Sequence, residues 1–139
     1  MRHRIAFEDQ LAQVPLFAGL SRDDLHQVSR LAVRAHEGTG THLVREGERG
    51  DELLVILEGT VDVRHERDVL ATLHAGDHLG EVALLDPRAR RTASVVATSP
   101  VTVAYLGRHE FDLMIRQSVD FVLALLAVMA IRIIDQETD

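Results

Sequence analysis

The chain has 139 residues, of which 46% are hydrophobic, so it is long and apolar enough to bury the core of a single domain spanning 1–139. Acidic residues outnumber basic ones by 22 to 15, and the resulting net charge of −7 argues against nonspecific binding to nucleic acid. Cysteine and lysine are both absent, which excludes disulfides, thiolate metal sites and Schiff-base chemistry.

The first forty residues are predicted to be helical. Ser21 is a suitable N-cap, acidic residues follow it in the next turn, and Leu25 and Val28 lie at helical spacing. The first ten residues lack the apolar centre of a signal peptide, and the longest apolar run, 121–131, is about half of what a bilayer span requires. We therefore expect a cytoplasmic protein without a membrane partner.

Glycine-rich turns separate short apolar runs from about 36 to 107. One of these runs, 60–64, alternates between apolar and polar residues as a half-buried strand does. The spacing leaves no room for the helical crossovers that a parallel sheet needs. We predict strands at 41–45, 52–58, 60–64, 69–73, 92–98 and 101–106.

Helical patterns return over about 108–136, as a short helix over 108–116 and a longer one over 119–136 that contains no glycine or proline. The predicted fold is therefore α+β. It is an antiparallel β-roll, a jelly-roll-like double-stranded β-helix, flanked by N-terminal helices and a long C-terminal helix.

The segment 80–95 contains the residues suited to bind an anion. A helical turn starting at Glu81 would present free backbone N–H groups, and Arg88, Arg90 and Arg91 follow closely. Small residues come next, so a ligand can approach the backbone. These features predict a phosphate pocket in an acidic protein, whereas the alternative is a charged surface turn.

The two ends of this segment, Gly80-Glu81-Val82-Ala83-Leu84 and Arg91-Thr92-Ala93-Ser94-Val95, resemble the phosphate-binding cassette of cyclic nucleotide-binding domains, including bacterial sensor domains of the Crp/Fnr type. The resemblance extends to the turn over 46–51, the strand after it, and the approach at 75–81. It covers roughly residues 14–136.

The resemblance implies cAMP or cGMP as the bound ligand. Glu81 would accept the ribose 2′-hydroxyl and Arg91 would hold the cyclic phosphate. The other implied ligand-binding residues are Gly80 and the backbone amides of Val82, Ala83, Thr92 and Ala93. Arg88 lies too close to Glu81 to leave room for the loop between them, so Arg91 is preferred over Arg88.

Three further positions are implied by alignment with the family. Val63 and Leu70 would line the base pocket, although both are also ordinary inward-facing strand residues. Arg132 would reach Glu81 from the last helix, and the alternative is a solvent-facing arginine at the end of that helix. Thr92 permits cGMP without demanding it, and we favour cAMP.

No catalytic motif is apparent, so we do not expect an enzyme. Metal-dependent enzymes of the cupin class share the β-roll shape but use histidines one residue apart. No two of the eight histidines here have that spacing, and we expect no metal site.

The last helix is apolar on every face and must be buried all round. We expect a homodimer through this helix, with a seam of Val122, Leu125, Met129 and Ile133; the alternative is packing against the chain's own N-terminal helices. The predicted function is a sensor that repositions this helix on binding nucleotide and acts on an unidentified effector protein, with no direct DNA binding. The alternative function is a dimerising interaction module that needs no ligand.

Overall fold

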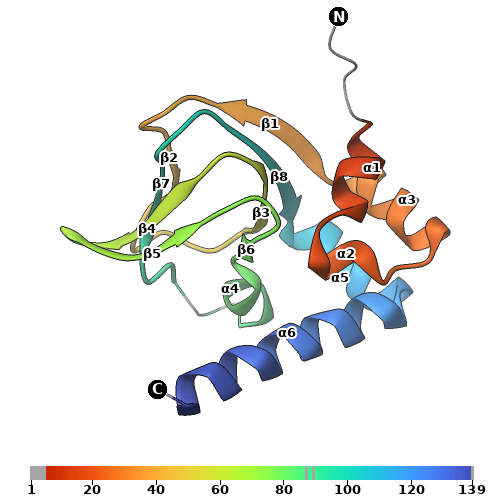
Figure 1. Cartoon of the computed structure of the whole chain (residues 1–139). Helices are drawn as coiled ribbons and strands as arrows, with labels where there is room; N and C mark the ends of the chain where they lie inside the picture. Colours follow the sequence, from red (N-terminus) through yellow and green to blue (C-terminus); the bar gives the residue numbers. More distant parts are fainter. Residues whose placement is uncertain (1–5, 87, 89, 139) are drawn as a thin grey trace, which may run out of the picture.

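The computed structural model shows a β-roll with helices gathered along one side (Figure 1). It describes residues 6–86, 88 and 90–138, and the side chains of 82, 83 and 132–138 lie outside that description. In the described part of the chain the helices are α1 (Phe7–Ala12), α2 (Pro15–Ala18), α3 (Arg22–Leu31), α4 (Glu81–Leu85), α5 (Arg108–Gln117) and α6 (Val119–Thr138).

Two four-stranded sheets form the roll, and all their pairings are antiparallel. The first sheet has the order β1-β8-β3-β6 and the second the order β2-β7-β4-β5. The strands are β1 (Val33–Glu37), β2 (His42–Val44), β3 (Glu52–Glu58), β4 (Val61–His65), β5 (Asp68–Leu73), β6 (His78–Leu79), β7 (Ser94–Ala97) and β8 (Val101–Gly107). The predicted α+β fold is therefore confirmed.

The central strand β3 is covered on both faces. Leu53 and Val55 pack among the helices, while Leu54 and Ile56 point into the interior of the roll. This alternation follows from the two-residue period of a strand, and it explains why the run is apolar throughout. Because β3 contributes residues to both hydrophobic clusters, it joins the packing of the helices to that of the roll.

Phe121 anchors the start of α6. Its ring stacks on Phe17 at 6.2 Å between centroids and meets Phe111 edge-on at 5.7 Å. Ser118, just before the helix, donates to the Asp24 carboxylate at 2.6 Å and accepts from the Phe121 N–H at 3.1 Å. The hydrogen bonds of Ser118 thus connect the bend of 109° between α5 and α6 to Asp24 of α3.

Two expectations about the elements were wrong. Strand β1 begins directly after α3, inside the region predicted as helical, and pairs with β8 through the residues Val33 to Glu37. Strand β6, only two residues long, was not predicted because so short a strand carries no periodicity. Ser21 caps α3 as expected, accepting from the Asp24 N–H at 3.1 Å.

Candidate functional site

Arg91 and Gly80 meet at the centre of the predicted cassette. The Arg91 guanidinium donates from Nη2 to the Glu52 carbonyl at 2.6 Å. Gly80 has a φ of +103°, and a Cβ placed there would lie 2.6 Å from both Arg91 Nη1 and the Glu52 carbonyl oxygen. Only glycine fits this position, because both the backbone conformation and the space exclude a side chain.

Backbone pairing fixes where Arg91 points. Its N–H donates to the Glu48 carbonyl at 2.8 Å, and its carbonyl accepts from the Gly47 N–H at 2.8 Å. A cavity of about 190 Å³ opens beside the guanidinium, and it is lined by Leu43, Val44, Glu48, Arg49, Asp51, Glu52 and Arg91. The turn over 46–51, to which the family resemblance extends, is therefore a direct neighbour of Arg91.

Burial lowers the pKa of Arg91 below the ordinary value for arginine, while the nearby carboxylates of Glu52 and Asp51 oppose that shift and Arg108 adds to it. Arginine keeps its charge in proteins despite such shifts. A partly buried guanidinium that donates to a neutral carbonyl retains its positive charge for an anion. The arrangement suits the phosphate chemistry expected from the sequence.

Glu81 is the first residue of α4 and is only 1% exposed. Its Oε2 lies 3.9 Å from Nε2 of His78, which is also buried. The predicted helical turn at Glu81 is thus present, and the carboxylate lies next in sequence to the glycine that Arg91 contacts. Val82 and Ala83 follow within α4, and their side chains lie outside the described residues.

Arg88 occupies a different environment. Its side chain is 95% exposed and pairs with Asp86 at 3.8 Å. Arg90 is also exposed and donates to the Gly47 carbonyl at 3.3 Å. Of the three arginines, only Arg91 reaches Gly80, which is the register preferred from the sequence.

The remaining predicted site residues are spread around the cassette. Thr92 is exposed and Ala93 half-buried between Arg91 and β7. Val63 packs half-buried on the interior of the roll. Leu70 is the additional residue of a β-bulge in β5 and is 61% exposed, so the bulge turns it outward. The side chain of Arg132, on α6, lies outside the described residues.

Sequence reasoning missed Arg108, which links the cassette to α5. It donates to the carbonyl of Leu84 at 3.1 Å and of Gly50 at 2.6 Å, and its Nε lies 3.6 Å from the Asp51 carboxylate. The sequence contains a signal for this residue, because a positive charge in the first turn of a helix interacts unfavourably with the helix dipole. An arginine at that position therefore indicates an interaction outside the helix.

The expected seam on α6 was wrong at Leu125. This side chain is only 3% exposed and belongs to the chain's own core, while Val122 and Met129 are half-buried and the Ile133 side chain lies outside the described residues. Heptad spacing does not distinguish the face of an all-apolar helix that covers its own domain. The large side chains exposed on α6 are Val119, Leu123, Leu126 and Ile131.

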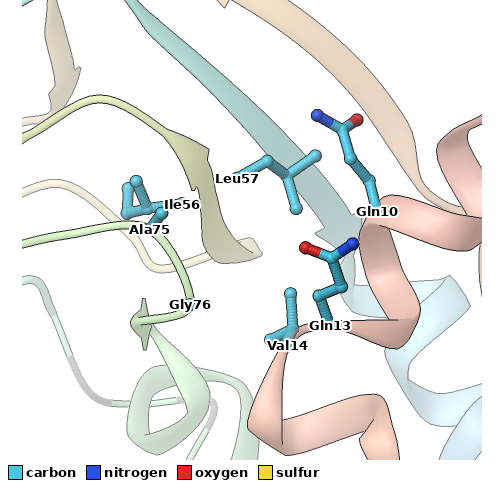
Figure 2. A pocket seen from close by; sticks show the side chains of 7 residues that line it. All are labelled: Gln10, Gln13, Val14, Ile56, Leu57, Ala75 and Gly76. Atoms are coloured by element: carbon cyan, nitrogen blue, oxygen red, sulfur yellow. The ribbon is translucent and has the colours of Figure 1, made fainter. Parts of the chain in front are cut away.

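Two cavities flank the segment around Val14 and Pro15, away from Arg91. The smaller, about 110 Å³, lies between α1 and the turn before β6, with Gln10 and Gln13 projecting from the helix (Figure 2). The larger, about 380 Å³, separates α6 from the turn before β6, and it is lined by Pro15, Leu73, Gly76, Asp77, His78, Val128 and Ile131.

Two searches of the described residues gave negative results. No group of three or more histidine, aspartate or glutamate side chains there has a geometry that could hold a metal ion. No single helix there is long and apolar enough to cross a membrane, and α5 and α6 meet that test only when taken together across their bend.

The comparisons with known proteins point to one family. The profile described as the cyclic nucleotide-binding domain matches residues 38–118. A cAMP-dependent protein kinase regulatory subunit from Mycosarcoma maydis is 36% identical over 115 residues, which cover 78% of this chain and 22% of the relative. The cGMP-dependent protein kinase isozyme 1 of Drosophila melanogaster is 34% identical over 113 residues, which cover 76% of this chain and 15% of the relative.

Solved structures agree in fold. The catabolite activator protein of Thermus thermophilus superimposes with a TM-score of 0.79 at 27% identity, covering 89% of this chain and 60% of that one. The regulatory subunit of a cAMP-independent protein kinase A from Trypanosoma brucei has a TM-score of 0.76 at 27% identity, covering 88% and 46%. This chain spans less than a quarter of the length of the two kinase relatives. With the profile matched over more than half of its length, the chain belongs to the family of cyclic nucleotide-binding regulatory domains.

Proposed function

We propose that this domain senses a cyclic purine nucleotide, cAMP in preference to cGMP, through the segment 80–93. The observation that carries the proposal is the position of the Arg91 guanidinium, which contacts Gly80 beside the buried carboxylate of Glu81. Arg91 binds the cyclic phosphate and Glu81 accepts the ribose 2′-hydroxyl. The backbone N–H groups of Val82, Ala83, Thr92 and Ala93 complete the cradle.

The preference for cAMP is a proposal about the base. Relatives include kinases named for each of the two nucleotides, and Thr92, exposed beside Arg91, is compatible with both. The relative with the higher identity of the two described above is named for cAMP, which supports that nucleotide. Val63, which packs on the interior of the roll, lines the base, whereas the bulge turns Leu70 away from that interior.

Signalling proceeds by a change in the position of α6 relative to the cassette. Leu84 of α4 packs in the same hydrophobic cluster as Phe121 and Leu125 of α6, so a shift of α4 is felt by that helix. The Arg108 contacts with Leu84 and Asp51 add a polar connection. The ligand shifts the balance between two arrangements only by its difference in affinity for them.

Two copies of the chain pair through α6. Leu123, Leu126 and Ile131 are each more than half exposed, and together with Val119 they form an apolar face on the helix. Such a face is typical of an interaction surface, and a helix twin supplies a matching apolar partner. This face replaces the seam through Leu125. The effector is a protein, since the net charge of −7 disfavours contact with DNA.

The alternative function is a dimerising module that needs no nucleotide. The exposed face of α6 is present without any ligand, and one structural neighbour is a regulatory subunit described as cAMP-independent. Calorimetric titration with cAMP and with cGMP separates the two functions. We expect saturable binding of both with tighter binding of cAMP; no heat with either nucleotide would support the alternative and refute the sensor.

A further inference from the structure

His78 lies behind the cassette with its ring directed at Glu81. It is 7% exposed, and its Nε2 is 3.9 Å from Glu81 Oε2. The left-handed turn at Gly80, with a φ of +103°, separates the two residues in the chain. A histidine is thus held within ion-pair distance of the carboxylate to which we assign the ribose hydroxyl.

The backbone around His78 is fixed on the central strand of its sheet. His78 pairs with Val55 of β3, and the neighbouring Asp77 carbonyl accepts from the Ile56 N–H at 2.9 Å. Val55 and Ile56 are both buried, so His78 is attached to a well-packed part of β3. Glu81, in contrast, lies on a helix of only five residues.

Among the described residues, three charged groups lie near the imidazole. Glu81 faces it from α4, Asp77 precedes it in the turn, and Arg91 reaches Gly80 from the other arm of the cassette. Asp77 is engaged, because its carboxylate accepts from the His74 N–H at 2.8 Å. Among the described residues that share the cavity at His78, α2 and α6 contribute only apolar side chains, Pro15, Val128 and Ile131.

We propose that His78 is a positioning residue for Glu81, and that its protonated form holds the Glu81 carboxylate ionised and oriented toward the sugar of the bound nucleotide. This inference rests on the role proposed above for Glu81. No contact between His78 and the ligand is required, because the histidine acts on the Glu81 carboxylate and not on the nucleotide.

Two physical effects both predict that protonation of His78 strengthens binding of the nucleotide. Burial favours the uncharged form of the Glu81 carboxyl group and of the His78 imidazole alike, and the attraction between carboxylate and imidazolium offsets that tendency for both groups. The nucleotide is itself an anion, so an additional positive charge near Arg91 favours its binding. Histidine is the side chain that ordinarily gains its proton between about pH 8 and pH 5. Affinity for the nucleotide therefore rises as the pH falls through this range.

The test measures the Kd of cAMP and of 2′-deoxy-cAMP by calorimetry at about pH 8 and about pH 6. The wild type is compared with His78→Phe, which keeps a ring of similar size, and with His74→Asn, which removes an exposed histidine from the same turn. We expect cAMP to bind the wild type about fivefold more tightly at the lower pH, within the tenfold per pH unit that one proton allows.

His74→Asn keeps this pH dependence and His78→Phe loses it. With 2′-deoxy-cAMP the pH dependence is smaller in the wild type, because the hydroxyl that donates to Glu81 is missing and only the attraction between the protonated ring and the anionic ligand remains. If His78 has a purely structural role, the loss of affinity caused by His78→Phe and the loss caused by removing the 2′-hydroxyl should instead be additive. The wild type with the two nucleotides is a complete test in itself if His78→Phe does not fold.

The outcomes separate the inference from the function on which it rests. If the wild type binds cAMP with the same affinity at both pH values, or if His78→Phe keeps the dependence, His78 does not position Glu81 although the domain is a sensor. If cAMP and 2′-deoxy-cAMP bind equally at both pH values, the role of Glu81 is wrong. If cAMP does not bind at all, the proposed function falls and this inference with it.

Discussion

Replacing Arg91 with alanine tests the site most directly. In the wild type, the guanidinium is partly buried, donates to the Glu52 carbonyl at 2.6 Å and borders a cavity of about 190 Å³. A bound cyclic phosphate would cover the rest of it. Removing the arginine leaves the phosphate buried without its counter-charge, a loss that typically weakens binding by about 2–5 kcal/mol, or about 30-fold to about 4,000-fold in Kd.

Arg88→Ala is the matched control, because it removes the same side chain three positions earlier in the same loop. That side chain is 95% exposed and pairs with Asp86 only at the surface. Exposed pairs contribute less than about 1 kcal/mol, so the Kd should change by less than about fivefold. Calorimetric titration with cAMP gives both values, and denaturant unfolding without ligand verifies that each variant is folded. A larger loss for Arg88→Ala than for Arg91→Ala would refute the assigned register.

Three further predictions concern the cassette turn, the last helix and the single tyrosine. Gly80→Ala forces a side chain into a left-handed position against Arg91 and the Glu52 carbonyl. The free energy of unfolding should therefore fall by about 1–3 kcal/mol, and cAMP should bind more weakly. Gly38→Ala, with open space around the residue, should change neither quantity. Leu126→Glu should dissociate the dimer in sedimentation while changing the free energy of unfolding by no more than about 0.5 kcal/mol. Leu125→Glu, in the core, should lower the free energy of unfolding by about 2–5 kcal/mol or prevent folding. Dimers that survive Leu126→Glu would exclude this face as the interface. Burial, with Glu37 and then Glu52, raises the pKa of Tyr105 to about 12, so the native state keeps a proton that the unfolded chain releases near pH 10, and stability should fall as the pH rises from about 10 to 12. The chain has one tyrosine, so near-ultraviolet absorbance follows this titration without ambiguity, and Tyr105→Phe should remove the tyrosine's contribution to the fall.

Much of the roll could be predicted because its strands carry periodic information. The run that forms β3 is apolar along its length, as is typical of a strand covered on both faces. The run that forms β4 alternates between apolar and polar residues, as is typical of a strand covered on one face. Strand β1 follows α3 with only Ala32 between them and shows no regular alternation of burial, so the boundary between helix and strand was placed too late. Local pattern predicted the strands of four or more residues that follow a turn, and it failed at the two-residue strand β6.

The register of the cassette stays a prediction, and the expected helix seam was wrong at Leu125. Small residues follow Arg91 and not Arg88, and Arg91 is half-buried where Arg88 is exposed. On α6 every candidate face was apolar, so the choice between Leu125 and Leu126 depended on where Phe17 and Leu84 would pack, which no spacing within the helix encodes. Arg108 has its partners Leu84, Gly50 and Asp51 across the fold, which no local spacing encodes, whereas the partner of His78, Glu81, is only three residues away.

The distribution of charge explains how an acidic domain holds an anion. The cavity beside Arg91 is lined by more carboxylates than guanidinium groups, so Arg91 would be neutralised if Asp51 paired with it. Instead Asp51 lies 3.6 Å from Nε of Arg108, and Arg91 donates to a neutral carbonyl. Arg108 therefore keeps the arginine of the cassette available for phosphate. Because Arg108 begins α5 and also holds the Leu84 carbonyl of α4, the residue that preserves the charge of the site is the same one that connects it to the helices.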